Sequence, residues 1–197
     1  SHGNNEYPFL IDEDGIWVLP ITSIGLDYPV SRSFISSGIP RLDQMFNGKG
    51  FYCGSSILVS GTAGTGKTSL AAHLVNEACG NGQRCLYIAF EESADQIIRN
   101  MQSIGINLAQ WVDSGLLRFH TARPSLQGAE LHLLTIQKIT QEYRPEVVVV
   151  DPITNLVQIA SLTEVKSMLV RIIDFFKMHK ITAMFTSLTE GGEMLER

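Results

Sequence analysis

The stretch Gly61-Thr62-Ala63-Gly64-Thr65-Gly66-Lys67-Thr68 fits the pattern G-x-x-x-x-G-K-[ST] at every position. A short apolar run, 57–60, precedes it and an amphipathic segment, 68–78, follows it, which are the strand and helix that the pattern requires. In such a loop the glycines let successive backbone N–H groups point at phosphate oxygens, and the following helix adds its positive end. We therefore interpret these residues as a loop that holds the phosphates of a nucleotide.

The side chains of this loop have separate expected roles. Lys67 is expected to reach the β- and γ-phosphates and to act in catalysis by offsetting charge, and the Thr68 hydroxyl is expected to ligate Mg²⁺. ATP and Mg²⁺ are thus the expected ligands. The ATP-binding residues expected from the loop are Thr62, Ala63, Gly64, Thr65, Gly66, Lys67 and Thr68.

Outward from the loop, short apolar runs alternate with helical patterns. The expected strands are 57–60, 85–90, 116–120, 147–150 and 182–186, and the expected helices are 68–78, 93–103, 127–143 and 162–179. Apolar strands that alternate with helices are typical of a mainly parallel sheet with helices on both faces. The predicted fold class is therefore α/β, with a phosphate-loop NTPase core.

The N-terminal segment departs from this pattern. Two short apolar runs, 7–11 and 16–19, flank the acidic stretch Asp12-Glu13-Asp14-Gly15, which predicts a β-hairpin. A polar stretch that contains a proline, 28–33, follows and is interpreted as a linker. The chain is therefore divided into 1–33, a hairpin and linker, and 34–197, the ATPase domain.

Composition argues against several classes of protein. Of 197 residues, 15 are Lys or Arg and 20 are Asp or Glu, which disfavours a protein that holds nucleic acid through a basic face. No apolar run is long enough to span a bilayer, so no membrane partner is expected. The three cysteines lack the CxxC spacing of zinc sites and are odd in number. A reducing, cytoplasmic setting is the resulting expectation.

A second element completes the expected magnesium site. Residues 147–150 are four valines that form an apolar strand, and Asp151 follows them directly. Parallel sheets bind ligands at the carboxyl ends of their strands, so Asp151 is expected to hold Mg²⁺ through its water shell. The alternative is a carboxylate that only opens a turn before Pro152, and the phosphate loop in the same chain argues against it.

The general base has to come from elsewhere, because Pro152 follows Asp151 where many phosphate-loop ATPases carry a glutamate. Glu91 and Glu92 follow the strand 85–90, and a right-handed β-α-β unit places them at the same sheet edge as the phosphate loop. Neighbouring carboxylates raise each other's proton affinity, which suits a base. Which of the two is catalytic stays open, and so does the alternative that both simply precede the next helix, whose dipole favours negative charge there.

Thr186 and Ser187 end the last expected strand. A hydroxyl at this edge can sense the γ-phosphate or orient a water, and Ser187 is a further candidate for ATP binding. The alternative, polar residues that simply close a strand, stays open.

The phosphate loop, the Glu91-Glu92 pair one β-α-β step later and the late Asp151 together resemble the RecA/DnaB-type ATPase core. Four further stretches are similar to KaiC-like proteins: 37–43, 46–51, 90–93 and 185–187. The resemblance implies a RecA-like fold. The hairpin and linker resemble the junction between the two ATPase domains of KaiC, which implies a second domain whose C-terminal part is missing and whose residues 1–33 are the tail of the first domain.

The resemblance also implies activity and partners. It implies a homo-oligomeric ring, hexameric, with ATP between subunits, and Ser/Thr autokinase activity in the parent protein with acceptor residues beyond Arg197. It further implies a signalling or circadian-timing switch with KaiB-like or other signalling partners. The position of Glu91 and Glu92 matches the catalytic carboxylates of the family.

Two other functions fit the same core. A DNA-acting RecA-like recombinase or helicase would carry basic DNA-binding loops, and this acidic chain shows no loop rich in Lys and Arg. A nucleotide-dependent ring scaffold with little turnover would not need Lys67, Glu91-Glu92 and Asp151 together.

Overall fold

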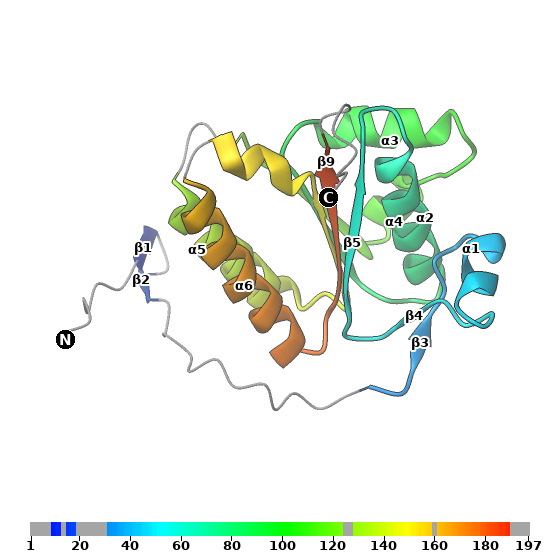
Figure 1. Ribbon diagram of the computed structural model, residues 1–197, viewed down its shortest axis with the longest axis horizontal. Helices are drawn as coiled ribbons and strands as arrows, with labels where there is room; N and C mark the ends of the chain where they lie inside the picture. The colour runs from blue at the N-terminus through cyan, green and yellow to red at the C-terminus, as the bar shows by residue number, and fades with distance from the viewer. Residues whose placement is uncertain (1–8, 13–14, 19–30, 124–127, 159–160, 190–197) are drawn as a thin grey trace, which may run out of the picture.

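The computed structural model describes residues 9–12, 15–18, 31–123, 128–158 and 161–189. Its centre is a five-stranded sheet with the strand order β5-β9-β8-β6-β7, and its strand pairs are parallel (Figure 1). The strands are β5 (Ser56–Gly61), β6 (Cys85–Ala89), β7 (Leu117–Thr121), β8 (Val147–Asp151) and β9 (Thr182–Leu188). The predicted α/β fold with a mainly parallel sheet is confirmed, and all five expected strands are present.

The middle of the sheet is buried, and its central strand β8 consists of four β-branched valines before its last residue. β8 lies between β9 and β6, and each of its four valines is at most 1% exposed. Branched side chains suit the pleated surface of a strand. Asp151 is the last residue of β8, so a fully buried strand carries a carboxylate to the carboxyl edge of the sheet.

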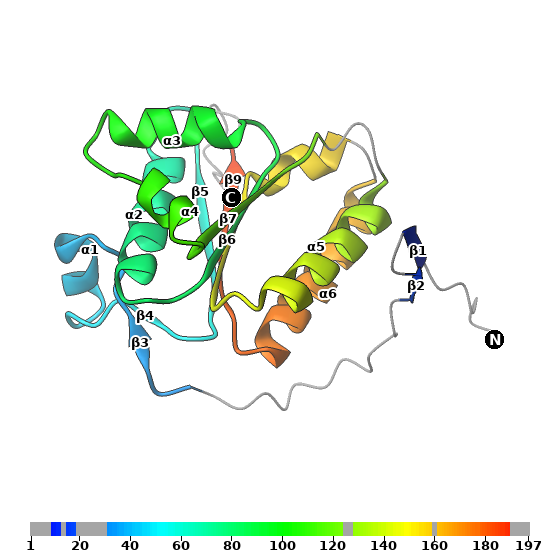
Figure 2. The same cartoon turned by 180° about the vertical axis from the view of Figure 1, so that it is seen from behind.

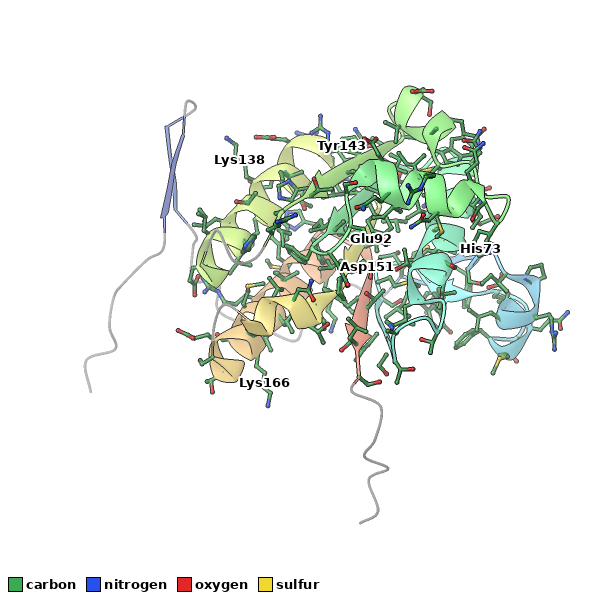
Figure 3. The ribbon with its side chains drawn as sticks, turned by 90° about the horizontal axis from the view of Figure 1, so that it is seen from above. His73, Glu92, Lys138, Tyr143, Asp151 and Lys166 are labelled. Atoms are coloured by element: carbon green, nitrogen blue, oxygen red, sulfur yellow. The ribbon has the colours of Figure 1, made fainter. Side chains whose placement is uncertain are left out.

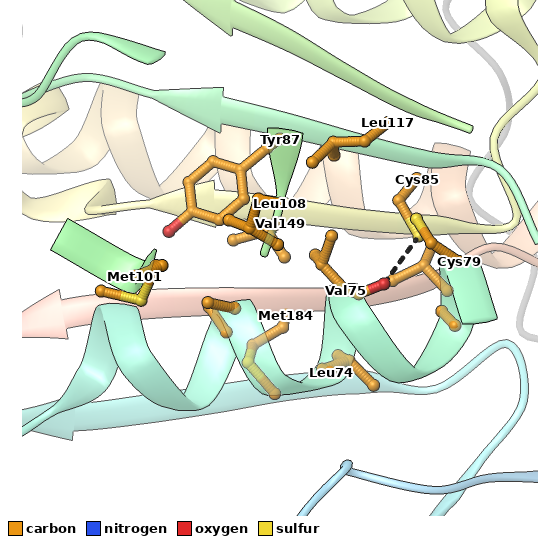
Figure 4. Packing of buried hydrophobic residues seen from close by; sticks show 14 of the residues in the cluster. Leu74, Val75, Cys79, Cys85, Tyr87, Met101, Leu108, Leu117, Val149 and Met184 are labelled. Carbon is orange, nitrogen blue, oxygen red and sulfur yellow. Dashed lines mark hydrogen bonds between the residues drawn. The ribbon is translucent and has the colours of Figure 1, made fainter. Parts of the chain in front are cut away.

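Helices cover both faces of the sheet, as predicted (Figures 1 and 2). One face packs against α2 (Lys67–Gly80), α3 (Ala94–Gln102) and α4 (Ala109–Asp113), and the other against α5 (Ala129–Tyr143) and α6 (Leu162–Met178). Each face has its own hydrophobic cluster, and Figure 4 shows the one beneath α2. Capping boxes at Ser93 and Ser161 begin α3 and α6. None of the helices in the described ranges is long and apolar enough to cross a membrane.

Sequence periodicity does not predict several short elements. β3 (Phe34–Ile35) and β4 (Phe51–Tyr52) pair antiparallel, and α1 (Pro40–Met45) lies between them in the chain. At Gly50 φ is +78°, and a Cβ there would lie 2.2 Å from the Ile35 carbonyl oxygen, so only glycine fits. α4 and the 3₁₀ segment η2 (Ile153–Gln158) are also unpredicted. None of these elements exceeds six residues, which is too short for a periodic pattern.

The N-terminal hairpin is confirmed. β1 (Phe9–Asp12) and β2 (Gly15–Val18) pair antiparallel, with Phe9 opposite Val18. In both views the hairpin lies beside α5 (Figures 1 and 2). Of the predicted linker, residues 28–30 lie outside the described residues.

Candidate nucleotide-binding site

The predicted phosphate loop connects the end of β5 to the start of α2, at the carboxyl edge of the sheet. Gly64 and Gly66 have φ angles of +77° and +85°, a region that residues with a Cβ avoid. This backbone curls the loop in front of α2, whose first N–H groups lack partners within the helix. The loop is open to a ligand, because its exposed residues are Thr62, Ala63, Gly64, Thr65 and Gly66.

Lys67 is the first residue of α2, and its ammonium group turns back onto the loop. Its Nζ donates to the carbonyl oxygens of Gly61 at 2.9 Å and Thr62 at 2.7 Å. The Thr65 hydroxyl also donates to the Thr62 carbonyl, at 2.9 Å. The Lys67 and Thr65 side chains thus donate to carbonyl oxygens of the loop itself. A phosphate that accepts from Lys67 would replace these carbonyl oxygens as the acceptor.

Asp151 accepts hydrogen bonds from three side-chain hydroxyls. Thr68 Oγ1 and the Tyr87 hydroxyl both donate to Oδ2, at 2.9 Å and 2.5 Å, and Thr186 Oγ1 donates to Oδ1. Asp151 is only 8% exposed, so these donors replace water around its carboxylate. The two predicted Mg²⁺ ligands, Thr68 and Asp151, are therefore in direct contact although they lie 83 residues apart in the sequence.

Glu91 and Glu92 follow β6 and lie at the same edge, as predicted from the β-α-β connection. Both line a small pocket together with Thr68 and Asp151. Figure 3 shows Glu92 beside Asp151. A second pocket, of about 200 Å³, adjoins the pair on the side of β7, where Thr121 lines it. The two glutamates thus lie between the candidate magnesium ligands, Thr68 and Asp151, and the second pocket, which has room for further groups.

The two glutamates differ in their surroundings. Burial and the charges of Asp151 and Glu91 raise the pKa of Glu92. The hydrogen bond from Asn100 and the positive charge of Arg99 act against this rise. Asn100 Nδ2 donates to Glu92 Oε1 at 3.0 Å, which fixes that carboxylate. Glu91 is exposed, and within the described part of the chain no side chain donates a hydrogen bond to it. Glu92 is therefore the restrained member of the pair and Glu91 the free one.

Ser187 lies next to the loop but outside the network around Asp151. It is half-buried on β9, in register with Ser60, the residue before Gly61. Its neighbour Thr186 is fully buried and donates to Asp151. The structure thus brings Thr186, rather than Ser187, into contact with Asp151, a candidate magnesium ligand.

Tyr87 is the member of this network that sequence reasoning missed. A tyrosine within an apolar strand has the pattern of a core residue, and its ring is indeed completely buried. The signal in the sequence is that one hydroxyl interrupts the otherwise apolar run 85–90. Buried hydroxyls need a partner, and here the partner is Asp151.

The oxygen donors at this edge fit Mg²⁺. Magnesium bound beside a nucleotide takes one or two oxygens from the protein, and phosphates and water supply the remainder. The Thr68 hydroxyl and the Asp151 carboxylate are such oxygens, they are in contact, and they lie at the start of α2 beside the phosphate loop. The site therefore has the donor set that a magnesium–nucleotide complex requires.

Comparison with known families identifies the family to which this domain belongs. The model of the family described as "ATPase: KaiC" matches residues 35–195 of this chain. The chain belongs to the KaiC ATPase family. The resemblance seen in the sequence is therefore confirmed, and the phosphate loop and the Asp151 network are parts of a KaiC-type ATPase domain.

Curated KaiC proteins are similar to the chain over nearly its whole length. It is 52% identical over 191 residues to "Circadian clock protein KaiC2" of Synechocystis sp., which covers 97% of this chain and 34% of that protein. It is 36% identical to "Circadian clock protein KaiC3" of the same organism, over 96% of this chain and 37% of that protein. The "Circadian clock oscillator protein KaiC" of Synechococcus elongatus is 34% identical, with 96% and 36% covered. The KaiC-type chain thus spans about a third of the length of these relatives.

Proposed function

We propose that this KaiC-type domain binds ATP together with Mg²⁺ and hydrolyses it, and that the parent protein also transfers the γ-phosphoryl group to Ser or Thr of its own assembly. The observation that carries the proposal is the contact between Thr68, at the end of the phosphate loop, and Asp151, with Glu91 and Glu92 lining the same pocket. A nucleotide on the loop would have its terminal phosphate near these carboxylates.

The reaction is an in-line displacement. An oxygen of water, or of a Ser or Thr hydroxyl, attacks the γ-phosphorus, and the bond between that phosphorus and the oxygen shared with the β-phosphate breaks, so that ADP leaves. The proton of the attacking group passes to a glutamate. Lys67 leaves the carbonyls of Gly61 and Thr62 and, with the N–H groups of the loop, offsets charge on the phosphates. When bound at Thr68 and Asp151, Mg²⁺ supplies further positive charge at the phosphate oxygens.

Within this proposal Glu91 is the general base and Glu92 orients the site. A base must reach the attacking oxygen and give a lone pair to its proton. Glu91 is exposed and keeps its lone pairs free within the described residues, whereas one oxygen of Glu92 accepts from Asn100.

The biological setting is proposed from the relatives. Their names are those of circadian clock proteins, which supports a role for the parent protein as a timing or signalling switch. We include in the proposal a homo-oligomeric ring, with ATP between subunits. The family match begins at residue 35, which supports the domain boundary near residue 33.

The test follows the γ-phosphate. The full-length protein is incubated with Mg²⁺ and ATP labelled on the γ-phosphate, and label is measured in free phosphate and in protein, with and without single-stranded DNA. Label in both pools is the expected result. Label only in free phosphate would remove the autokinase part, and stimulation by DNA would favour a RecA-like motor instead. No release of label over hours would leave a nucleotide-dependent scaffold.

Single substitutions separate the two glutamates. Glu91→Gln is expected to lower the turnover number by about 100-fold or more, since general base catalysis contributes roughly 10²–10⁴-fold. Glu92→Gln serves as the matched variant and is expected to lower it by about tenfold or less, because the amide can still contact Asn100. ATP affinity should change little in either. A larger loss in Glu92→Gln than in Glu91→Gln would reverse the assignment of the base.

A further inference from the structure

Tyr87 lies in the middle of β6, with its side chain on the face that α2 and α3 cover. In register it stands between Val149 of β8 and Phe119 of β7, and its ring lies 5.2 Å from that of Phe119. The side chain is 0% exposed. Figure 4 shows its ring among aliphatic and sulfur-containing side chains. The ring is therefore held rigidly by packing.

The hydroxyl of Tyr87 is not explained by that packing. The other buried members of the cluster are aliphatic residues, cysteines and methionines, so a phenylalanine would fill the same space. A hydroxyl without a partner would be costly at this depth, because no water reaches it. Among the residues that the structure describes, the hydroxyl has one hydrogen-bond partner, Asp151 Oδ2, at 2.5 Å.

That oxygen is also the one that Thr68 contacts. Thr68 Oγ1 donates to Oδ2 at 2.9 Å, so a residue of the phosphate loop and a residue of the core meet on a single atom. Thr186 donates to the other oxygen. The carboxylate is thus held at both of its oxygens, and Tyr87 donates from a ring that packing keeps in place.

We propose that Tyr87 is a positioning residue for the magnesium site: its hydroxyl holds Asp151 Oδ2 in the orientation in which Asp151 and Thr68 together receive the ion. The inference rests on the proposed Mg²⁺–ATP function and adds to it a residue of the core that does not touch the nucleotide. Groups that orient metal ligands in this way contribute roughly 10–100-fold to metal affinity.

The test measures how strongly Mg²⁺ and nucleotide support each other's binding. The dissociation constant of a fluorescent ADP analogue is measured with Mg²⁺ and with EDTA, and the ratio of the two is the magnesium coupling. Tyr87→Phe is expected to reduce this coupling by about tenfold, through weaker binding in Mg²⁺ and unchanged binding in EDTA. Circular dichroism and the unfolding temperature verify that the variant is folded.

Tyr143→Phe is the matched control. The Tyr143 hydroxyl donates to the Gly115 carbonyl oxygen at 2.8 Å, away from the loop, so this variant removes the same atom from a tyrosine outside the site. Its coupling is expected to equal that of the unmodified protein. Equal coupling in all three proteins, or an equal loss in both variants, would overturn the inference, since Tyr87 would then contribute only to folding.

A double-variant cycle tests whether Tyr87 acts through Asp151. In an Asp151→Asn background, Tyr87→Phe is expected to cause no further loss of coupling, because the group that it orients has already been changed. A second, additive loss would overturn the inference. If the unmodified protein shows no coupling at all, the proposed Mg²⁺ function fails together with this inference; coupling in the unmodified protein that Tyr87→Phe leaves intact overturns the inference alone.

Discussion

Asp43 and Asp151 are two aspartates that the fold buries to the same extent, each 8% exposed, and surrounds with hydroxyl groups. Asp43 in α1 accepts from the hydroxyls of Ser36 and Ser37, both at 2.6 Å, and from the Ser37 N–H at 2.9 Å. These partners lie six or seven residues away in the sequence. The partners of Asp151 lie 35, 64 and 83 residues away, on three other elements.

The same chemistry therefore serves two purposes. Around Asp43 the hydrogen bonds close one local turn, between β3 and α1. Around Asp151 they join β6, β9 and the start of α2 at the edge where the phosphate loop lies. A local network stabilises the segment that contains it, whereas a network between distant elements can assemble a site.

The largest expected effect is on ATP turnover, for which only one of the two aspartates is expected to be important. Asp151→Asn is expected to lower Mg²⁺-dependent ATP turnover by about 100-fold, because an amide is a poorer ligand and a poorer acceptor for three hydroxyls. Asp43→Asn should turn over ATP at nearly the unmodified rate while it is folded. Phosphate release at saturating ATP measures both, and an equal loss in a folded Asp43→Asn protein would contradict the distinction.

The stability of the fold is also expected to depend on Asp43. Asp43→Asn is expected to lower the free energy of unfolding by about 2 kcal/mol, since hydrogen bonds to a charged group contribute roughly 1.5–3 kcal/mol. Urea unfolding followed by circular dichroism measures the change. Destabilisation below about 0.5 kcal/mol, the range of ordinary surface substitutions, would mean that the turn around Asp43 does not depend on its charge.

A smaller effect on stability is expected from the loss of one hydrogen-bond partner of Asp43. Ser37→Ala removes one hydroxyl from Asp43 and keeps the Ser37 N–H donor, so a loss of about 1 kcal/mol is expected. Magnesium coupling of nucleotide binding should stay unchanged. A reduced coupling at unchanged stability would show that the Asp43 turn communicates with the ATP site.

The smallest expected effect concerns acid pH. Burial alone raises the pKa of Asp43, but hydrogen bonds from Ser36 and Ser37 outweigh it, so the pKa lies below its ordinary value of 3.8. The folded state therefore binds this proton less readily than the unfolded state. The stabilisation is complete above the ordinary pKa and is lost as pH falls through the lowered one. Asp43→Asn should show a shallower loss of stability over this acid range than the unmodified protein, and a parallel pH dependence would contradict the cause given.

Particular residues show what the sequence could predict. The phosphate loop and Asp151 are readable because each has a fixed pattern: glycines at set spacings in one, a run of valines before an acid in the other. The place of Glu91 and Glu92 followed from the handedness of β-α-β units. The contact of Tyr87 with Asp151 could not be read in this way, since it requires knowing that β6 and β8 are neighbours. The Asp43 turn was missed because elements of two to six residues leave no periodic signal.

The strand order has a consequence for how this domain is made in the cell. Within the described residues β5, which leads into the phosphate loop, pairs with β9 alone, and their hydrogen bonding extends to Gly54 and Thr182, 128 residues apart. Chains emerge from the ribosome N-terminus first, and contacts between distant segments form late. The loop that is among the first parts of the domain to be synthesised is thus among the last to be fixed in place. A nascent chain that stops before β9 would lack the strand that pairs with β5, so ATP is expected to support folding only after β9 has been synthesised.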